Sequence, residues 1–153
     1  QENLVKSHAC GTGPEVPRDI VLLMLFLKVQ SLAYGYSGVQ VETVERLIDM
    51  FNERVLPRIY EMGSLGASGD LAPLAHLSLT LIGSGEAHYL GKIYSGEEIL
   101  KLLGWEKIHF KAKEGLALLN GTQFMSAYGI WSLLHAHRLL KLSNLIGALS
   151  LDA

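Results

Sequence analysis

One short stretch combines residue types that could build a reactive group from the main chain itself. It runs from Gly63 to His76, and Ala67, Ser68 and Gly69 lie near its centre. Glycine allows backbone angles that are closed to other residues, so a tight turn is possible here. In such a turn the Gly69 amide nitrogen could attack the Ala67 carbonyl carbon and close a five-membered ring with loss of water. Loss of the Ser68 hydroxyl as a second water would leave an exocyclic methylidene, which is an electrophile.

Three other interpretations of this stretch stay open on the residues alone. Small residues recur by chance, so it also fits a glycine-rich loop followed by Asp70 as a helix cap. A serine hydrolase could use Ser68 with His76 or Asp70, although the strand–Ser–helix spacing of such enzymes is missing. A non-catalytic helical packing or interaction module would explain the apolar helices but not the stretch itself.

The composition limits the remaining function classes. The chain has 153 residues, of which 49% are hydrophobic and 18% charged, and this composition excludes a disordered protein. Thirteen Lys and Arg against fifteen Asp and Glu leave no basic field for nucleic acid or an anionic membrane. The single cysteine excludes a disulfide framework and a cysteine-based zinc site. We expect no metal, no nucleic acid partner and no membrane partner.

The elements that must position the reactive stretch are mainly helical. Apolar spacing predicts helices over about 17–32 and 41–55, with Pro57 ending the second. Residues 57–69 are expected to form a loop, and a third helix is expected over 70–82. The further expected elements are a hairpin at 89–94, a helix from the Ser95–Glu98 capping box to Gly104, and helices at 114–119, from Thr122 to about Lys141 and from Ser143 onward.

The surroundings of Ala-Ser-Gly make the pattern specific. The stretch from Gly63 to His76 resembles the signature of the aromatic amino acid ammonia-lyases and aminomutases. Three further segments resemble parts of that family in the same order: residues 3–13 its substrate-side loop, 32–39 its next helix end, and 118–123 its asparagine turn. The resemblance therefore covers essentially the whole chain.

The resemblance implies a fold class and a cofactor. The fold would be mainly α, a fragment of the long-helix-bundle ammonia-lyase fold with a minor β-hairpin near 89–94. Ala67, Ser68 and Gly69 would fuse autocatalytically into a methylidene-imidazolone, with no external cofactor. Asp70 would assist the ring closure. Asn120 would lie beside the ring and help to hold both the ring and the substrate.

Ser7 and His8 indicate the substrate. Phenylalanine-specific members of the family resemble Phe-Leu here, tyrosine-specific members His-Leu, and histidine-specific members Ser-His. An imidazole needs polar neighbours, and His8 can exchange a hydrogen bond with a ring nitrogen. The implied reaction is elimination of ammonia from L-histidine to give trans-urocanate. A phenylalanine or tyrosine ammonia-lyase, or an aminomutase, remains the alternative within the family.

The resemblance also implies that this chain is incomplete. It starts at Gln1 without an initiator Met and stops at Ala153 inside an apolar run. Residues 1–153 would be a single piece of a larger chain, holding the cofactor-forming region and the start of the central helical bundle. The catalytic base and the arginine that binds the substrate carboxylate would lie outside it, so the piece alone should be inactive. The complete protein would be a cytoplasmic homotetramer.

Overall fold

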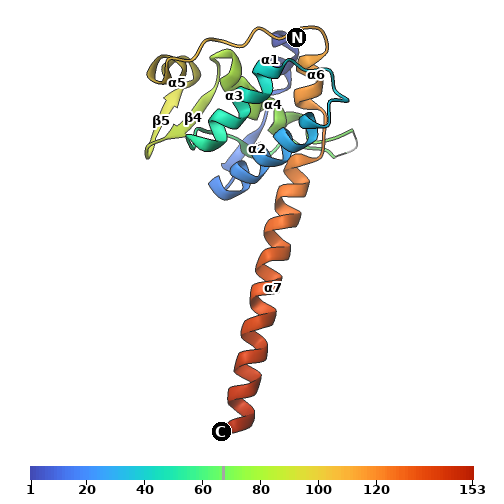
Figure 1. Cartoon of the computed structure of the whole chain (residues 1–153), viewed down its shortest axis with the longest axis vertical. Helices are drawn as coiled ribbons and strands as arrows, with labels where there is room; N and C mark the ends of the chain where they lie inside the picture. Colours follow the sequence, from blue (N-terminus) through green and yellow to red (C-terminus); the bar gives the residue numbers. More distant parts are fainter. Residues whose placement is uncertain (67) are drawn as a thin grey trace.

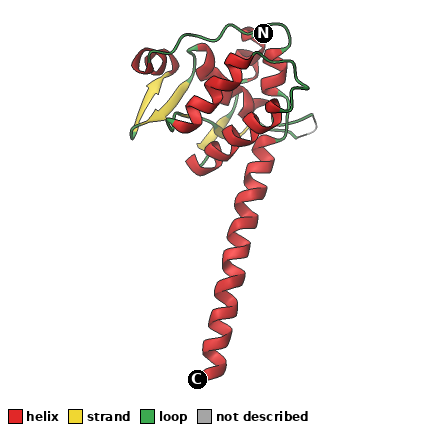
Figure 2. Ribbon diagram, viewed as in Figure 1, coloured by secondary structure: helices red, strands yellow, loops and turns green. Residues whose placement is uncertain are grey.

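A body of short helices and two small sheets holds most of the chain, and one long helix extends from it (Figures 1 and 2). The structure, a computed structural model, describes residues 1–66 and 68–153. Its helices are α1 (Glu2–His8), α2 (Arg18–Ala33), α3 (Val41–Asn52), α4 (Leu71–Leu79), the 3-10 turn η1 (Thr80–Ile82), α5 (Gly96–Leu103), α6 (Glu114–Leu119) and α7 (Gln123–Asp152). The expected mainly α fold is confirmed.

The strands form two small antiparallel sheets. They are β1 (Thr12–Glu15), β2 (Leu56–Pro57), β3 (Tyr60–Met62), β4 (Glu86–Tyr89) and β5 (Lys92–Ser95). β1 pairs with β3, and the other sheet has the order β2-β4-β5. The expected hairpin around Gly91 is confirmed, and it begins earlier, at Glu86. The expectation of a loop over 57–69 is wrong in part, because Tyr60–Met62 pairs with the chain that follows α1.

The core forms where α2 packs between α3 and the first turns of α7. It is built mainly from aliphatic and methionine side chains of α2, α3 and α4, including Ile20, Met24, Leu25, Leu47, Met50, Leu74 and Leu77. Burial of such side chains is the main source of folding free energy. The packing also holds the end of α6 and the start of α7 against α2, which matters for the site described below.

Three helix boundaries differ from the sequence-based expectation. The helix expected over 70–82 is α-helical only to Leu79 and ends in the 3-10 turn η1. α3 ends at Asn52, before Pro57, because Arg54 adopts a left-handed conformation with φ 58° and Val55 leaves the helix. The Val55 N–H then donates to the Met50 carbonyl, a bond that closes a helix C-terminus. The break expected before Ser143 is absent, and α7 continues through it, since neither Gly nor Pro interrupts the helix there.

From Leu133 onward, α7 carries exposed apolar side chains. They include Leu133, Leu134, Leu139, Leu140, Ile146 and Leu149. Figure 1 shows this part of the helix projecting away from the body. Within residues 1–66 and 68–153, no helix is both long enough and apolar enough to cross a membrane.

Candidate active site

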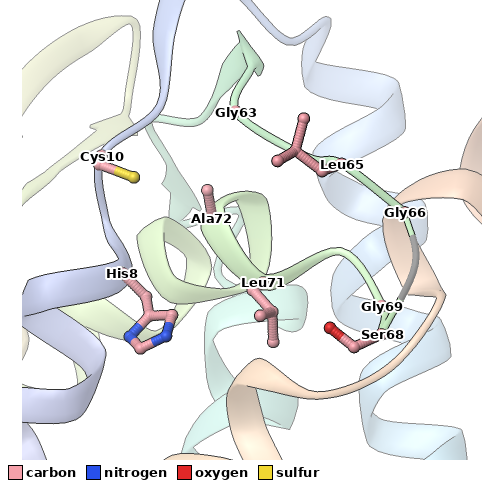
Figure 3. A pocket seen from close by; sticks show the side chains of 9 residues that line it. All are labelled: His8, Cys10, Gly63, Leu65, Gly66, Ser68, Gly69, Leu71 and Ala72. Atoms are coloured by element: carbon pink, nitrogen blue, oxygen red, sulfur yellow. The ribbon is translucent and has the colours of Figure 1, made fainter.

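A pocket of about 320 Å³ lies at the N-terminal end of α4 (Figure 3). His8 and Cys10, at the end of α1 and just after it, form one side of the pocket. Ser68 and Gly69 lie on the other side, and α4 runs between the two sides. The structure therefore brings the expected substrate-side residue His8 together with two residues of the Ala-Ser-Gly turn. The third of these, Ala67, lies outside the described residues.

Gly69 sits where only a glycine fits. Its φ of +120° lies in the region that other residues rarely adopt. A Cβ atom at this position would lie 2.7 Å from the Gly121 carbonyl oxygen and 3.1 Å from Asn120 Oδ1. The structure thus places the Asn120 side chain against the main chain of the turn. Because residue 69 has no side chain, the main chain of Gly121 and the side chain of Asn120 can approach it closely. This arrangement fits a prosthetic group formed from the backbone itself.

Asp70 joins three segments of the chain around the turn. It is 4% exposed, and its main-chain N–H donates to the Gly121 carbonyl at 2.7 Å. Its carboxylate accepts from the Ser64 hydroxyl at 3.1 Å and from the Met125 N–H at 3.0 Å. Met125 lies in the first turn of α7, where amide groups have no partner within their own helix. The Asp70 side chain therefore caps α7.

The expectation that the Asp70 side chain caps its own helix is wrong. Asp70 occupies the N-cap position of α4, but its side chain makes no capping bond there. Thr122 likewise begins α7 as expected without a side-chain cap. The carboxylate of Asp70 supplies the cap that Thr122 does not, and a negative charge at a helix N-terminus is stabilising.

Asn120 directly follows the last residue of α6 and is exposed. Its carbonyl accepts a hydrogen bond from Lys28 Nζ at 3.2 Å. Lys28 is 1% exposed in the middle of α2, and burial lowers the pKa of its ammonium group to about 8. Sequence reasoning missed this residue, although a single lysine within an apolar helix was the available signal.

The Ser7-His8 pair lies in the last turn of α1, so this part of the expected substrate-side loop is helical. His8 Nδ1 is 2.8 Å from the Leu4 carbonyl oxygen, a contact in which Nδ1 must donate. In a neutral ring, Nε2 of His8 is then the nitrogen that accepts hydrogen bonds. The Ser7 hydroxyl also donates to the Leu4 carbonyl, at 2.9 Å, and Ser7 is not part of the pocket lining.

His76, on α4, binds the chain that follows α1, on the same side of the pocket as His8 and Cys10. Its Nε2 accepts a hydrogen bond from the Gly11 N–H at 3.0 Å, and its ring meets Tyr60 edge-on. Burial lowers the pKa of His76, which favours the neutral ring that this bond needs. In the part of the chain that the structure describes, no hydrogen bond joins Ser68 to His76 or Asp70. The hydrolase alternative therefore has no geometric support.

In the ranges 1–66 and 68–153, no group of three or more His, Cys, Asp or Glu side chains is arranged to hold a metal ion.

Comparison with known proteins defines the family. The model of the family "Aromatic amino acid lyase" matches residues 1–153. A histidine ammonia-lyase of Streptococcus pyogenes serotype M49 is 50% identical over 152 residues, which are 99% of this chain and 30% of that protein. The chain belongs to the aromatic amino acid lyase family. It spans about 30% of the length of the curated relatives that it matches.

Solved structures of enzymes with two different activities share the fold of this chain. The crystal structure of histidine ammonia-lyase from Trypanosoma cruzi matches with a TM-score of 0.84 and 40% identity, covering 90% of this chain and 27% of that one. Phenylalanine aminomutase of Pantoea agglomerans matches with a TM-score of 0.85 and 33% identity, covering 93% of this chain and 27% of that one. The fold is therefore common to lyases and aminomutases.

Proposed function

We propose that this chain is the cofactor-forming part of a histidine ammonia-lyase, which converts L-histidine to trans-urocanate and ammonia. The observation that carries the proposal is the pocket that His8 shares with Ser68 and Gly69. It joins a side chain able to recognise an imidazole to the turn from which the prosthetic group would form. The 50% identity to a histidine ammonia-lyase supports the same substrate.

Ala67, Ser68 and Gly69 would form a methylidene-imidazolone, which supplies an electrophile that makes the substrate amine a better leaving group. The missing side chain of Gly69 leaves its amide nitrogen unhindered. Asp70, the next residue, has a buried carboxylate that would assist the ring closure. The Asn120 amide, which lies against Gly69, would hold the ring and the substrate by hydrogen bonds.

His8 would orient the substrate ring. Its Nδ1 is engaged by the Leu4 carbonyl, so its Nε2 can accept a hydrogen bond from an N–H of the substrate imidazole. A phenyl ring has no such donor, so Nε2 of His8 would be left without a hydrogen-bond partner when phenylalanine binds. Loss of a required hydrogen bond in a closed site lowers the rate for the wrong substrate strongly. The geometry of His8 therefore favours histidine over phenylalanine.

The remaining machinery is proposed to lie outside residues 1–153. The base and the arginine for the substrate carboxylate would come from other segments of a larger, cytoplasmic chain. The exposed apolar face of α7 supports assembly into a homotetramer, because large apolar surfaces mark interaction sites. Active sites would then be completed by neighbouring subunits.

The test offers L-histidine, L-phenylalanine and L-tyrosine separately to the complete enzyme that carries this sequence. Ultraviolet absorbance follows urocanate, cinnamate and coumarate, and chromatography detects β-amino acids. Urocanate from histidine alone supports the proposal. Cinnamate or coumarate would assign another lyase, and a β-amino acid would assign an aminomutase, which the fold likeness to such enzymes makes the second candidate. A folded but inert protein would favour the packing module.

Intact mass tests the prosthetic group independently of turnover. The complete protein should weigh two waters less than its sequence. Ser68→Ala removes the hydroxyl that leaves as the second water, so this variant should lack the full deficit and lose activity. An unmodified mass with an intact Ser68 side chain in an active enzyme would refute the cofactor assignment.

A further inference from the structure

Lys28 is a buried cation whose location needs an explanation. It is 1% exposed on α2, with the buried side chains of Met24, Leu25 and Leu32 on the same helix. Among the described residues, no ion pair includes it. Moving an ammonium group out of water is costly, and the lowered pKa of about 8 reflects that cost. An apolar residue of similar shape would fill the same space without the cost of burying a charge.

The polar contact of Lys28 leads directly to the candidate site. Its Nζ donates to the carbonyl of Asn120, the residue that ends α6. A cation is favoured at a helix C-terminus, where carbonyl groups lack partners within the helix. The next residue, Gly121, accepts the hydrogen bond from the Asp70 N–H at 2.7 Å. The Asn120–Gly121 turn thus lies between the Lys28 ammonium and the turn that contains Ser68, Gly69 and Asp70.

The close contacts at this turn leave little room for movement. A Cβ on Gly69 would lie 2.7 Å from the Gly121 oxygen and 3.0 Å from the Gly121 nitrogen. A small displacement of the Asn120–Gly121 turn would therefore change both the Asp70 hydrogen bond and the direction of the Asn120 amide. Lys28, on α2, donates to the Asn120 carbonyl of this turn at 3.2 Å.

We propose that Lys28 is a positioning residue, whose hydrogen bond to the Asn120 carbonyl fixes the Asn120–Gly121 turn against the cofactor-forming turn. The catalytic part of this inference rests on the proposed function. Lys28 does not touch the substrate. It acts through Asn120, whose amide it aims at the group formed from residues 67–69, and through Gly121, which holds Asp70.

The test replaces Lys28 by Met in the complete enzyme and first measures amide hydrogen exchange in the peptide that contains Asp70. Lys28→Met keeps the length and apolar stem of the side chain but removes the donor. Exchange at Asp70 should become about tenfold faster or more, as expected for loss of one charge-assisted hydrogen bond. The melting temperature should stay unchanged or rise, because a buried charge is removed. A merely structural role would lower it.

Kinetics and intact mass give the second readout. In Lys28→Met, kcat should fall about tenfold or more while KM changes less, since the substrate contacts stay in place. The fraction of protein with the two-water mass deficit should also fall. Lys28→Arg keeps a charged donor, so kcat and the fraction with the mass deficit should both be higher than in Lys28→Met. Should Lys28→Met not fold, Lys28→Leu is the second variant, with the same expected exchange.

Ile20→Val is the matched control. Ile20 is 1% exposed on the same helix, and its loss of one methyl group should lower the melting temperature without changing exchange at Asp70. Unchanged exchange at Asp70 in the Lys28 variants would overturn the proposal, whatever the activity. Faster exchange with wild-type kcat and full ring formation would overturn it too. An inactive wild-type enzyme would instead refute the proposed function, and exchange alone would then decide whether Lys28 holds the turn.

Discussion

The Asp70 carboxylate accepts a hydrogen bond from the Met125 N–H at 3.0 Å, so the residue after Ala-Ser-Gly caps a helix other than the one it begins. The two residues are 55 positions apart in the sequence. The bond ties the first turn of α7 to the N-cap of α4, the residue that directly follows Gly69. Any rearrangement of the turn during ring closure must therefore be compatible with the position of α7.

Asp70→Asn should lower the free energy of unfolding by about 1–2 kcal/mol, since it removes a charged cap from α7. The same variant should show little or no two-water mass deficit, because the carboxylate that would assist the ring closure is gone. Urea titration and intact mass measure the two effects. Asp19→Asn, at an exposed position in the first turn of α2, is the control and should change stability by less than about 0.5 kcal/mol. Equal effects of the two variants would contradict the capping role.

Gly69→Ala should destabilise the protein by more than about 2 kcal/mol, because the added Cβ would lie 2.7 Å from the Gly121 oxygen. Gly91→Ala is the matched control: its φ is +80°, and nothing lies within 4 Å of a Cβ there. It should cost only about 1 kcal/mol of backbone strain. Thermal unfolding of the two variants, side by side, checks the difference. Similar losses of stability in the two variants would show that the contact with Gly121 does not exclude a side chain at position 69.

Glu114 should make stability depend on acidic pH. Burial acts to raise the pKa of its carboxyl, but hydrogen bonds from Gln40, Lys111 and Thr43 outweigh burial, and the pKa lies below its usual 4.5. At acidic pH the unfolded chain therefore binds the proton more readily than the folded one. This contribution to stability is complete above about pH 4.5 and is lost as the pH falls through the folded pKa.

The check is urea unfolding from pH 7 to pH 3 in wild type and Glu114→Gln. The free energy of unfolding of Glu114→Gln should be lower by about 2 kcal/mol or more at neutral pH, because the main-chain N–H groups of Gln40 and Lys111 would face an amide instead of a carboxylate. Its stability should also depend less on pH in the acidic range. Glu45→Gln, an exposed position on α3, should keep the wild-type slope. A wild-type slope in Glu114→Gln would refute the assignment.

His76 should add a second pH dependence at higher pH. Burial lowers the pKa of His76 below 6.5, so the unfolded chain takes up this proton first as the pH falls. Stability should decrease as the pH falls from 6.5 toward the folded pKa, since protonated Nε2 can no longer accept from Gly11. His76→Gln, which keeps an acceptor, should remove this slope between about pH 6.5 and 5. His135→Gln, on the exposed part of α7, should not.

His8→Leu should lower kcat/KM for L-histidine by about a hundredfold, because the acceptor for the substrate imidazole is lost. The ratio of kcat/KM for L-histidine to that for L-phenylalanine should fall by a similar factor, and steady-state assays with both amino acids measure it. An unchanged ratio would show that His8 does not recognise the substrate ring.

Local patterns in the sequence were sufficient for several elements. The Ser95–Glu98 capping box is present with both of its hydrogen bonds, and the helix it begins ends at Gly104 as expected. The hairpin around Gly91 and the helix at 114–119 also match. In each case the residues that define the element lie within a few positions of one another. The Ala-Ser-Gly stretch is a local pattern of the same kind, and the chemistry proposed for it would depend on three consecutive residues and their neighbours.

The contacts that build the candidate site join residues that lie far apart in the sequence. Asp70 reaches Met125, His76 reaches Gly11, and Lys28 reaches Asn120, over separations of 55, 65 and 92 residues. No periodicity or spacing encodes such pairs, because each depends on how segments far apart in the sequence pack against one another. The sequence by itself determined most of the helices and indicated which groups on them could do chemistry. Only the tertiary structure decided that Asp70 caps α7 and that a buried lysine holds the asparagine turn, since long-range packing selects the partners of buried polar groups.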